Sequence, residues 1–217
     1  MLLYLQKEKL VILVLMLTIL SICSGAFANS DKNKIEDEKH YYELGLSHQT
    51  YGENQEAIDA YKQAIKIKPD YADAHIGLGI AYGQLGKYQE AVDAFKQAIR
   101  IKPDYAKAHY YLAVAYRKLG KKQAAVDAYK QAIRTNPDYA EAHFNLGGVY
   151  GQSGKYQEAV DAFKQTVRIK PDDAAAHYYL GFFYLLNNDK DSAMDQYEVL
   201  KDLDKKLAYK LFYNLNP

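Results

Sequence analysis

Four of the five prolines in the chain are evenly spaced, and this spacing limits the possible folds more than any other feature. Pro69, Pro103, Pro137 and Pro171 follow one another at intervals of 34 residues. A fixed period of this length is typical of repeat proteins, in which each small unit contacts only its neighbours. The sequence therefore predicts a continuous array of similar units rather than one domain with a single central core.

The prolines divide most of the chain into five units. These units are residues 38–71, 72–105, 106–139, 140–173 and 174–205. Within a unit, wide side chains recur at helical spacing at positions 4, 7, 11 and 24, while small residues occupy positions 8 and 20. Glycine at position 15 in four units ends one helix, and the Pro-Asp pair at positions 32 and 33 ends another. Each unit is therefore predicted to be an antiparallel helical hairpin.

The residues at four positions carry a family resemblance. Position 7 is Leu44, Leu78, Leu112, Leu146 and Leu180, and position 8 is Gly45, Gly79, Ala113, Gly147 and Gly181. Position 20 is alanine in every unit, and position 24 is Tyr61, Phe95, Tyr129, Phe163 and Tyr197. The pattern resembles the tetratricopeptide repeat over about residues 38–207. It implies an all-α fold, a right-handed α-solenoid of five helix-turn-helix repeats, which an amphipathic capping helix over residues 206–217 completes.

The first 37 residues differ from the repeats. Lys7 and Lys9 precede an apolar run from Leu10 to Ile22, and small residues with an Ala-x-Ala pattern follow it. Residues 1–28 are thus predicted to be a signal peptide and residues 29–37 a polar linker, so that the protein is exported to the periplasm or secreted. Two alternatives remain: an uncleaved membrane anchor, and lipidation of Cys23, although Ile22 departs from the lipoprotein pattern.

The charge balance and the single cysteine exclude several kinds of site. A formal net charge of +1 disfavours a nucleic-acid binder that acts through a general basic field. Cys23 lies in the leader, so a mature chain beginning after it contains no disulfide. One histidine recurs at position 4 of four units, and these histidines are too far apart to share one zinc ion. No cofactor and no metal site are predicted, and no catalytic motif indicates an enzyme.

A comparison of the repeats with one another indicates which part of the repeat varies in sequence. The second and fourth units are identical at 25 of 34 positions, and residues 86–97 match residues 154–165 without a change. Six of the nine differences lie in the first helix of the unit. The first helices are therefore the more variable surface.

In the family that the chain resembles, the first helices line a concave groove, and positions 2, 5, 6, 9, 12 and 13 contact a bound peptide. Transferred to this chain, the resemblance predicts a mostly aromatic groove of Tyr42, Leu46, Ile76, Ile80, Tyr110, Tyr111, Val114, Arg117, Phe144, Asn145, Tyr178, Tyr179 and Phe182. Tyrosines at position 5 would be the anchors. The alternative is that these residues only pack between neighbouring repeats as core.

A subset of the family binds a C-terminal carboxylate through lysine and asparagine side chains of three consecutive repeats. Only Asn145 matches that set, so such a clamp is not predicted. The sequence instead predicts a scaffold or adaptor that binds another protein or peptide. The alternative is structural self-assembly through dimeric or end-to-end stacking of repeats into a homo-oligomer. Contact with a membrane is expected only through the leader.

Overall fold

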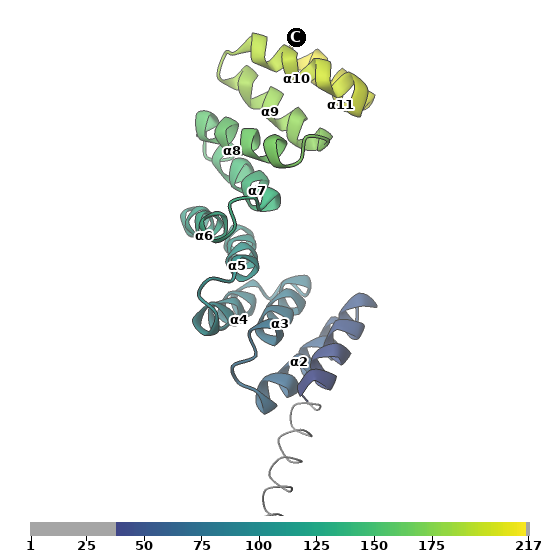
Figure 1. Ribbon diagram of the computed structural model, residues 1–217, viewed down its shortest axis with the longest axis vertical. Helices are drawn as coiled ribbons and strands as arrows, with labels where there is room; N and C mark the ends of the chain where they lie inside the picture. Colours follow the sequence, from purple (N-terminus) through teal and green to yellow (C-terminus); the bar gives the residue numbers. More distant parts are fainter. Residues whose placement is uncertain (1–37, 216–217) are drawn as a thin grey trace, which may run out of the picture.

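The computed structural model describes residues 38–215 as one elongated stack of helical hairpins (Figure 1). The predicted signal peptide, the polar linker and the last two residues of the predicted cap lie outside the described residues. Residues 38–215 contain helices and turns but no β-strand, so the all-α fold predicted from the sequence is confirmed.

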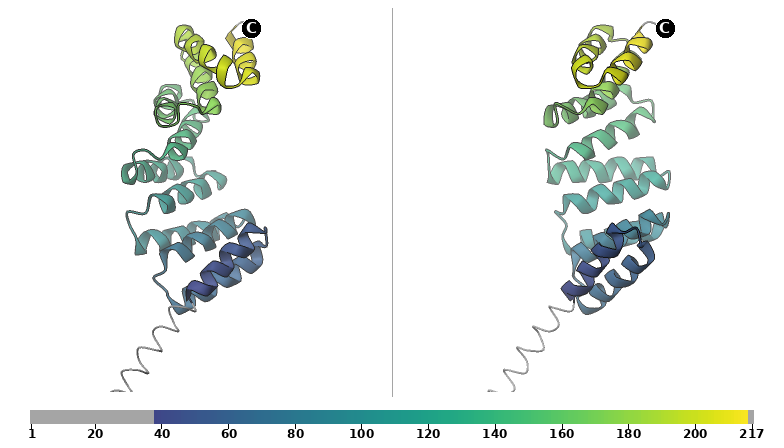
Figure 2. Two further views of the ribbon diagram at one scale, coloured as in Figure 1. Left: turned by 45° about the vertical axis from the view of Figure 1, so that its right-hand side comes forward. Right: turned by 90° about the vertical axis from the view of Figure 1, so that its right-hand side faces the viewer.

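Two helices come from each repeat. A helix over residues 38–50 is followed by α2 (Asn54–Ile67), α3 (Ala72–Gln84), α4 (Tyr88–Ile101), α5 (Ala106–Lys118), α6 (Lys122–Thr135), α7 (Ala140–Gly151), α8 (Tyr156–Ile169), α9 (Ala174–Leu186), α10 (Lys190–Leu203) and α11 (Lys205–Leu215). Each helix packs mainly on its neighbours in the sequence. The turned views in Figure 2 show how the pairs stack into the α-solenoid expected from the repeats.

The turn inside each hairpin depends on a left-handed residue. Gly52, Gly86, Gly120 and Gly154 have φ angles between 72° and 78°. Such angles are open to glycine at little cost because it lacks a Cβ atom. In the fifth repeat Asn188 takes this place with φ 60°, which is consistent with the tolerance of asparagine for this region.

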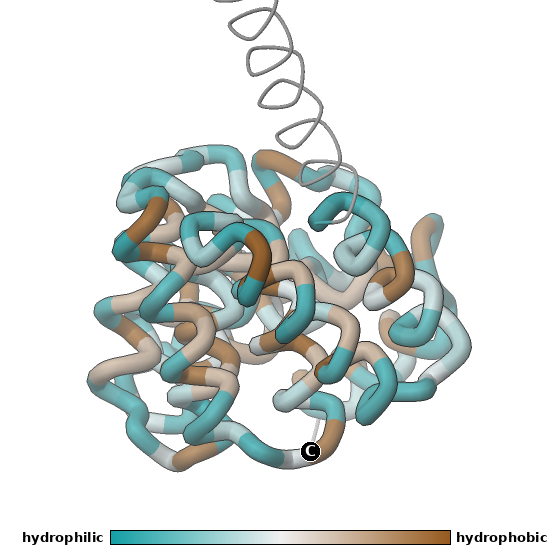
Figure 3. The backbone as a smooth tube through the Cα atoms, turned by 90° about the horizontal axis from the view of Figure 1, so that it is seen from below, coloured by the Kyte–Doolittle hydropathy of each residue, from teal (hydrophilic) through white to brown (hydrophobic). Residues whose placement is uncertain are grey.

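The core forms where an aromatic ring of the second helix meets a small residue of the first. Phe163 is 1% exposed and Tyr129 is fully buried. A Cβ atom on Gly147 would lie 2.8 Å from the Phe163 ring, so glycine is required for this close approach of two helices. Along the helices hydrophobic residues alternate with hydrophilic ones (Figure 3), as expected of amphipathic helices with one buried face.

The repeated histidines join consecutive repeats. In each case Nε2 donates to the carbonyl oxygen of the proline six residues earlier, at 2.8 to 3.0 Å, in the pairs His75–Pro69, His109–Pro103, His143–Pro137 and His177–Pro171. The bond ties the first turns of a new repeat to the end of the preceding one. It gives a partner to a backbone carbonyl in the connection between two helices.

The C-terminal helix α11 covers the last hairpin. Leu211 and Leu215 are buried and pack in one cluster with residues of α9 and α10. Helix α11 begins at Lys205, because the Asp204 carboxylate accepts hydrogen bonds from two backbone N–H groups of its first turn. None of the helices between residues 38 and 215 combines the length and hydropathy that crossing a bilayer requires.

Candidate functional site on the first helices

A first pocket, here called the N-terminal pocket, lies between α3, α4 and α5. Its volume is about 290 Å³ and its lining is mostly apolar. The residues that contribute to the walls include Ile80, Gly83, Gln84, Tyr88, Phe95, Tyr111, Val114 and Lys118. A cavity of this size holds one bulky side chain rather than a drug-sized molecule.

A second pocket, here called the C-terminal pocket, lies between α7, α8 and α9, with one residue from α5. Its volume is about 380 Å³. Its lining includes Arg117, Phe144, Asn145, Gly148, Gly151, Gln152, Tyr156, Phe163, Tyr179, Phe182, Phe183 and Leu186. Many of these rings contact one another, and the Phe163 ring stacks on Tyr179 and Phe183 with centroid distances of 5.6 Å. The pocket therefore has rigid aromatic walls.

The two pockets are equivalent places in the array, two repeats apart. Positions 12, 13, 17 and 24 are glycine, glutamine, tyrosine and phenylalanine in both the second and the fourth repeat. The following repeat completes each pocket through its positions 6, 9, 10 and 13. The near-duplication in the sequence thus places the same apolar hollow twice along one face.

Two glycines explain why these pockets are open. A Cβ atom added to Gly83 or to Gly148 would meet no atom within 4 Å, although both residues lie in helices. Glycine in a helix costs about 1 kcal/mol relative to alanine. Packing requires the glycine at Gly79 and Gly147, but it does not require one at Gly83 or Gly148. What these two glycines provide is empty space at the pocket wall.

The structure brings together eight of the predicted groove residues. Ile80, Tyr111 and Val114 line the N-terminal pocket. Arg117, Phe144, Asn145, Tyr179 and Phe182 line the C-terminal pocket. Leu46 is 42% exposed on the helix over residues 38–50 and lines neither of these pockets.

Two residues of position 5 that were predicted to line the groove are buried instead. Ile76 is only 3% exposed and belongs to the central hydrophobic core. Tyr178 is 7% exposed and packs with α11, whose Lys210 places its Nζ atom 4.8 Å from the centre of the ring. At these positions the side chain faces the neighbouring helices, so the alternative that it packs as core is correct there.

The other two tyrosines at position 5 are half-buried. Tyr42 contacts the rings of Tyr61 and Tyr71. Tyr110 stacks on Tyr139 with a centroid distance of 5.0 Å, and its hydroxyl accepts a hydrogen bond from Asn145 Nδ2 at 3.0 Å. Burial raises the pKa of Tyr42 and of Tyr110 above 10.0. Both rings thus pack against neighbouring aromatic rings, and neither lines one of the two pockets.

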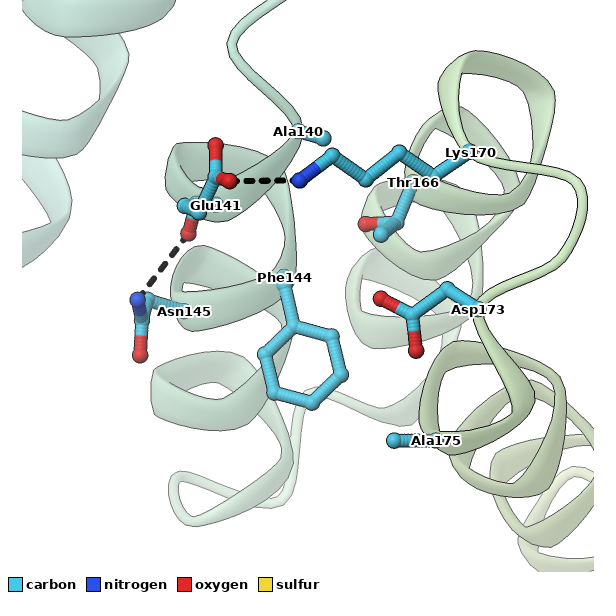
Figure 4. A pocket seen from close by; sticks show the side chains of 8 residues that line it. All are labelled: Ala140, Glu141, Phe144, Asn145, Thr166, Lys170, Asp173 and Ala175. Carbon is cyan, nitrogen blue, oxygen red and sulfur yellow. Dashed lines mark hydrogen bonds and ion pairs between the residues drawn. The ribbon is translucent and has the colours of Figure 1, made fainter.

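A further pocket, lined in part by charged side chains, adjoins the C-terminal pocket across α7. Phe144 and Asn145 line both cavities. In the adjoining one the Phe144 ring points toward Asp173, whereas Asn145 lies on the opposite side of α7 from Lys170 and Asp173 (Figure 4). Lys170 donates to the Glu141 carboxylate, and this hydrogen bond lowers the pKa of Glu141. The Asp173 carboxylate accepts the backbone N–H of Ala176 at the start of α9. These charged groups are therefore occupied by partners of their own.

Two sets of wall residues are absent from the predicted groove: those at position 13, a position that the resemblance names, and those at position 17, which sequence reasoning missed. Gln84, Tyr88, Gln152 and Tyr156 stand at the turn between the two helices of a hairpin, not on the central turns of the first helix. The available signal was Gly83 and Gly148, since glycine inside a predicted helix is unfavourable and calls for a packing or functional reason.

Family models agree with the repeat pattern. A model described as "Tetratricopeptide repeat" matches residues 78–140 and 110–174, another of the same description matches residues 151–212, and one described as "TPR repeat" matches residues 51–86. The chain belongs to the tetratricopeptide repeat family. Membership supports a general role as a scaffold for protein–protein interaction, and proteins of this kind are generally not enzymes. A comparison with curated protein sequences gives no match.

Solved structures of tetratricopeptide repeat proteins are similar over most of the chain. The crystal structure of MamA protein is 30% identical with a TM-score of 0.70, and the match covers 80% of this chain and 95% of that one. YrrB, described as "a TPR protein with an unusual peptide-binding site", is 25% identical with a TM-score of 0.66 and coverages of 85% and 96%. PilF of Pseudomonas aeruginosa, at 17% identity, TM-score 0.71 and coverages of 84% and 92%, shows the shared fold.

Proposed function

We propose that the protein is a non-enzymatic scaffold that binds an extended segment of another protein along its first helices. The observation that carries the proposal is the pair of equivalent apolar pockets, each with a helical glycine that meets no other atom. Open apolar pockets with a few polar groups are the usual form of a peptide-binding surface. The similarity to YrrB, a protein described as having a peptide-binding site, supports the proposal.

The spacing of the pockets favours an extended ligand. The first helices of consecutive repeats, such as α3 and α5, are neighbours in one row with a spacing of roughly 10 Å, so a step of two repeats along this row separates the pockets by roughly 20 Å. An extended chain covers this distance in about six residues. The ligand we propose is therefore a short segment with two bulky apolar side chains, one for each pocket.

The experiment tests whether the pockets bind the ligand. Peptides are selected from a displayed random library against the protein, and their affinities are measured by fluorescence anisotropy. Gly83→Leu and Gly148→Leu fill the empty spaces, and Glu90→Leu adds the same side chain at an exposed position of α4 as the control. We expect each pocket variant to lose about tenfold or more in affinity and the control to keep its affinity.

Unchanged affinity in both glycine variants would contradict the proposal, and so would equal losses in the control. The variants should remain helical because leucine favours helices more than glycine does. Circular dichroism of each variant checks this point before binding is measured.

We also infer from residues 1–28 that the scaffold works outside the cytoplasm, in the periplasm or as a secreted protein. Amino-terminal sequencing of the protein from its source should find Asn29 as the first residue. An intact Met1 with the protein in the membrane fraction would support the uncleaved anchor instead, and an acylated Cys23 would support a lipoprotein.

Self-assembly is the second candidate, because exposed aromatic side chains lie at both ends of the array. Tyr51 is 78% exposed in the first hairpin, and Tyr209 and Tyr213 are 72% and 68% exposed on α11. Contact between such ends would produce a mass that rises with concentration. A constant monomer mass in light scattering would exclude this candidate.

A further inference from the structure

Two buried hydrogen-bond donors in the third repeat have no partner. They are Nε of Arg117, in the last turn of α5, and the hydroxyl of Tyr129, on α6. The Tyr129 side chain is fully buried. An unpaired buried donor destabilises the folded state, so these two groups require an explanation.

The first repeat shows what the same positions do when they are paired. There, the hydroxyl of Tyr61 at position 24 donates to Oε1 of Gln49 at position 12, at 3.0 Å. In the second and fourth repeats these positions are phenylalanine and glycine, and they form the two apolar pockets. The third repeat keeps the tyrosine but has Arg117 in place of the glutamine.

This difference removes the internal acceptor. A glutamine amide offers an oxygen, whereas a guanidinium has five N–H donors and no acceptor. Arg117 forms no ion pair within residues 38–215. Its charge is nevertheless close to the Tyr129 hydroxyl: burial raises the pKa of Tyr129, and the positive charge of Arg117 lowers it in part.

The position of Arg117 in the array matters as much as its chemistry. Arg117 lines the C-terminal pocket, and the next residue, Lys118, lines the N-terminal pocket. Two cations therefore lie between the two apolar pockets. No aspartate or glutamate is among the described residues that line either pocket. A ligand with an acidic group between two apolar side chains would complement this arrangement of two cations and two apolar pockets.

We propose that Arg117 binds the side-chain carboxylate of an aspartate or glutamate in the middle of the bound segment, with an apolar side chain of that segment in each pocket. The inference rests on the proposed function and specifies its ligand. Arg117 lines the C-terminal pocket, and a carboxylate placed there can pair with its guanidinium through two parallel bonds. The carboxylate belongs to a side chain and not to a chain end, because pockets on both sides of Arg117 require the chain to continue.

The decisive variant is Arg117→Gln, which recreates the pair of residues seen in the first repeat. The amide oxygen can accept from the Tyr129 hydroxyl as Gln49 does from Tyr61. We expect the midpoint of thermal unfolding to stay equal or to rise by about 2–4 °C. A role of Arg117 in stabilising the fold alone predicts the opposite, a lower midpoint, and that result would overturn the inference.

Binding is measured with peptides chosen from the library selection, and both ends are chemically blocked in the first two of the three peptides. One peptide carries a central aspartate between two apolar residues, a second carries asparagine there, and a third ends in a free carboxylate after its first apolar residue. For the unaltered protein we expect the aspartate peptide to bind about ten to a hundred times more tightly than the asparagine peptide. For Arg117→Gln we expect the two affinities to become similar.

Three results of the binding measurements would also overturn the inference. The first is equal affinity of the aspartate and asparagine peptides for the unaltered protein, and the second is an unchanged preference for aspartate in Arg117→Gln. The third is tightest binding of the peptide with a free carboxylate end. If Gly148→Leu still weakens the aspartate and asparagine peptides, the proposed function stands and only the carboxylate site fails. If no peptide binds, the proposed function itself fails, and the carboxylate site with it.

Discussion

The N-terminal and C-terminal pockets share half of their walls and differ in the other half. Both take a glutamine, a tyrosine and a phenylalanine from positions 13, 17 and 24 of nearly identical repeats. The other side is Val114, Ala115 and Lys118 in one pocket and Phe182, Phe183 and Leu186 in the other. The following repeat therefore accounts for much of the difference between the pockets, to which position 9 adds Ile80 in one and Gly148 in the other.

This difference also decides the role of an identical residue. Gly83 and Gly151 both stand at position 12. A Cβ atom on Gly83 meets nothing within 4 Å, whereas one on Gly151 would lie 2.1 Å from the Phe183 ring. The same amino acid thus leaves space in one pocket and permits close packing in the other. The structural role of a glycine at a given position of the repeat therefore depends on the residue of the next repeat that faces it.

The largest expected effect separates the two halves of the array by pH. Burial raises the pKa of Tyr61, Tyr105, Tyr129 and Tyr139 above the unfolded value of 10.0, and all four lie before residue 140. Because the folded state favours the neutral phenol, their contribution is complete below pH 10 and is lost as the pH rises further. Repeats one to three should therefore lose structure before repeats four and five.

Tryptophan probes can follow this order, because the chain contains no tryptophan. Tyr88→Trp and Tyr156→Trp place one probe at the same position of the second and fourth repeats, and their fluorescence is recorded during an alkaline titration. The Tyr88→Trp signal should change at lower pH. A simultaneous change, or an earlier change in the fourth repeat, would contradict this account.

The next effect tests the two glycines of position 12. Gly151→Ala forces a methyl group against Phe183, and we expect a loss of about 1–3 kcal/mol in the free energy of unfolding. Gly83→Ala meets no atom and should add about 0.5–1 kcal/mol through helix propensity. Urea unfolding followed by circular dichroism measures both. If both substitutions change the free energy of unfolding in the same direction, the proposed difference in packing around Gly83 and Gly151 is wrong.

The smallest effect concerns the rim of the N-terminal pocket. Lys118→Leu gives this pocket the residue that the C-terminal pocket has at Leu186. We expect an aromatic side chain in the ligand to bind about two to five times more tightly there, because apolar area replaces a charged rim. Leu186→Lys should weaken binding at the other pocket to a similar extent. Each variant is titrated with peptides that differ only in the side chain that enters the altered pocket. Unchanged affinities in both variants would contradict this prediction.

Most of the fold could be predicted from the sequence because the determinants are local and repeated. Glycine at position 15 adopts the left-handed conformation predicted for it in all four repeats that carry it, and Gly147 meets Phe163 as a small residue must. Each of these rules needs only the residues of one hairpin. Five copies of the same pattern then determine the stacking.

The site was less predictable because its walls come from two repeats and from residues that no periodicity marks. Whether Tyr178 lines a groove depends on α11, which lies outside the repeat pattern and buries it. Likewise, the difference between Gly83 and Gly151 depends on position 10 of the next repeat. The unpaired donors of Arg117 and Tyr129 become visible only when the hydrogen bonds are traced in space.

The most direct test of binding along the first helices is a titration of the protein, labelled with nitrogen-15, with a selected peptide. The backbone amide signals of Gly83 and Gly148 are followed by nuclear magnetic resonance, because these residues lie at the two pockets. We predict that both signals shift with the same dissociation constant, since one peptide would occupy both pockets. Saturation by the peptide with both glycine signals unmoved, and with shifts confined to the second helices or to α11, would contradict the account.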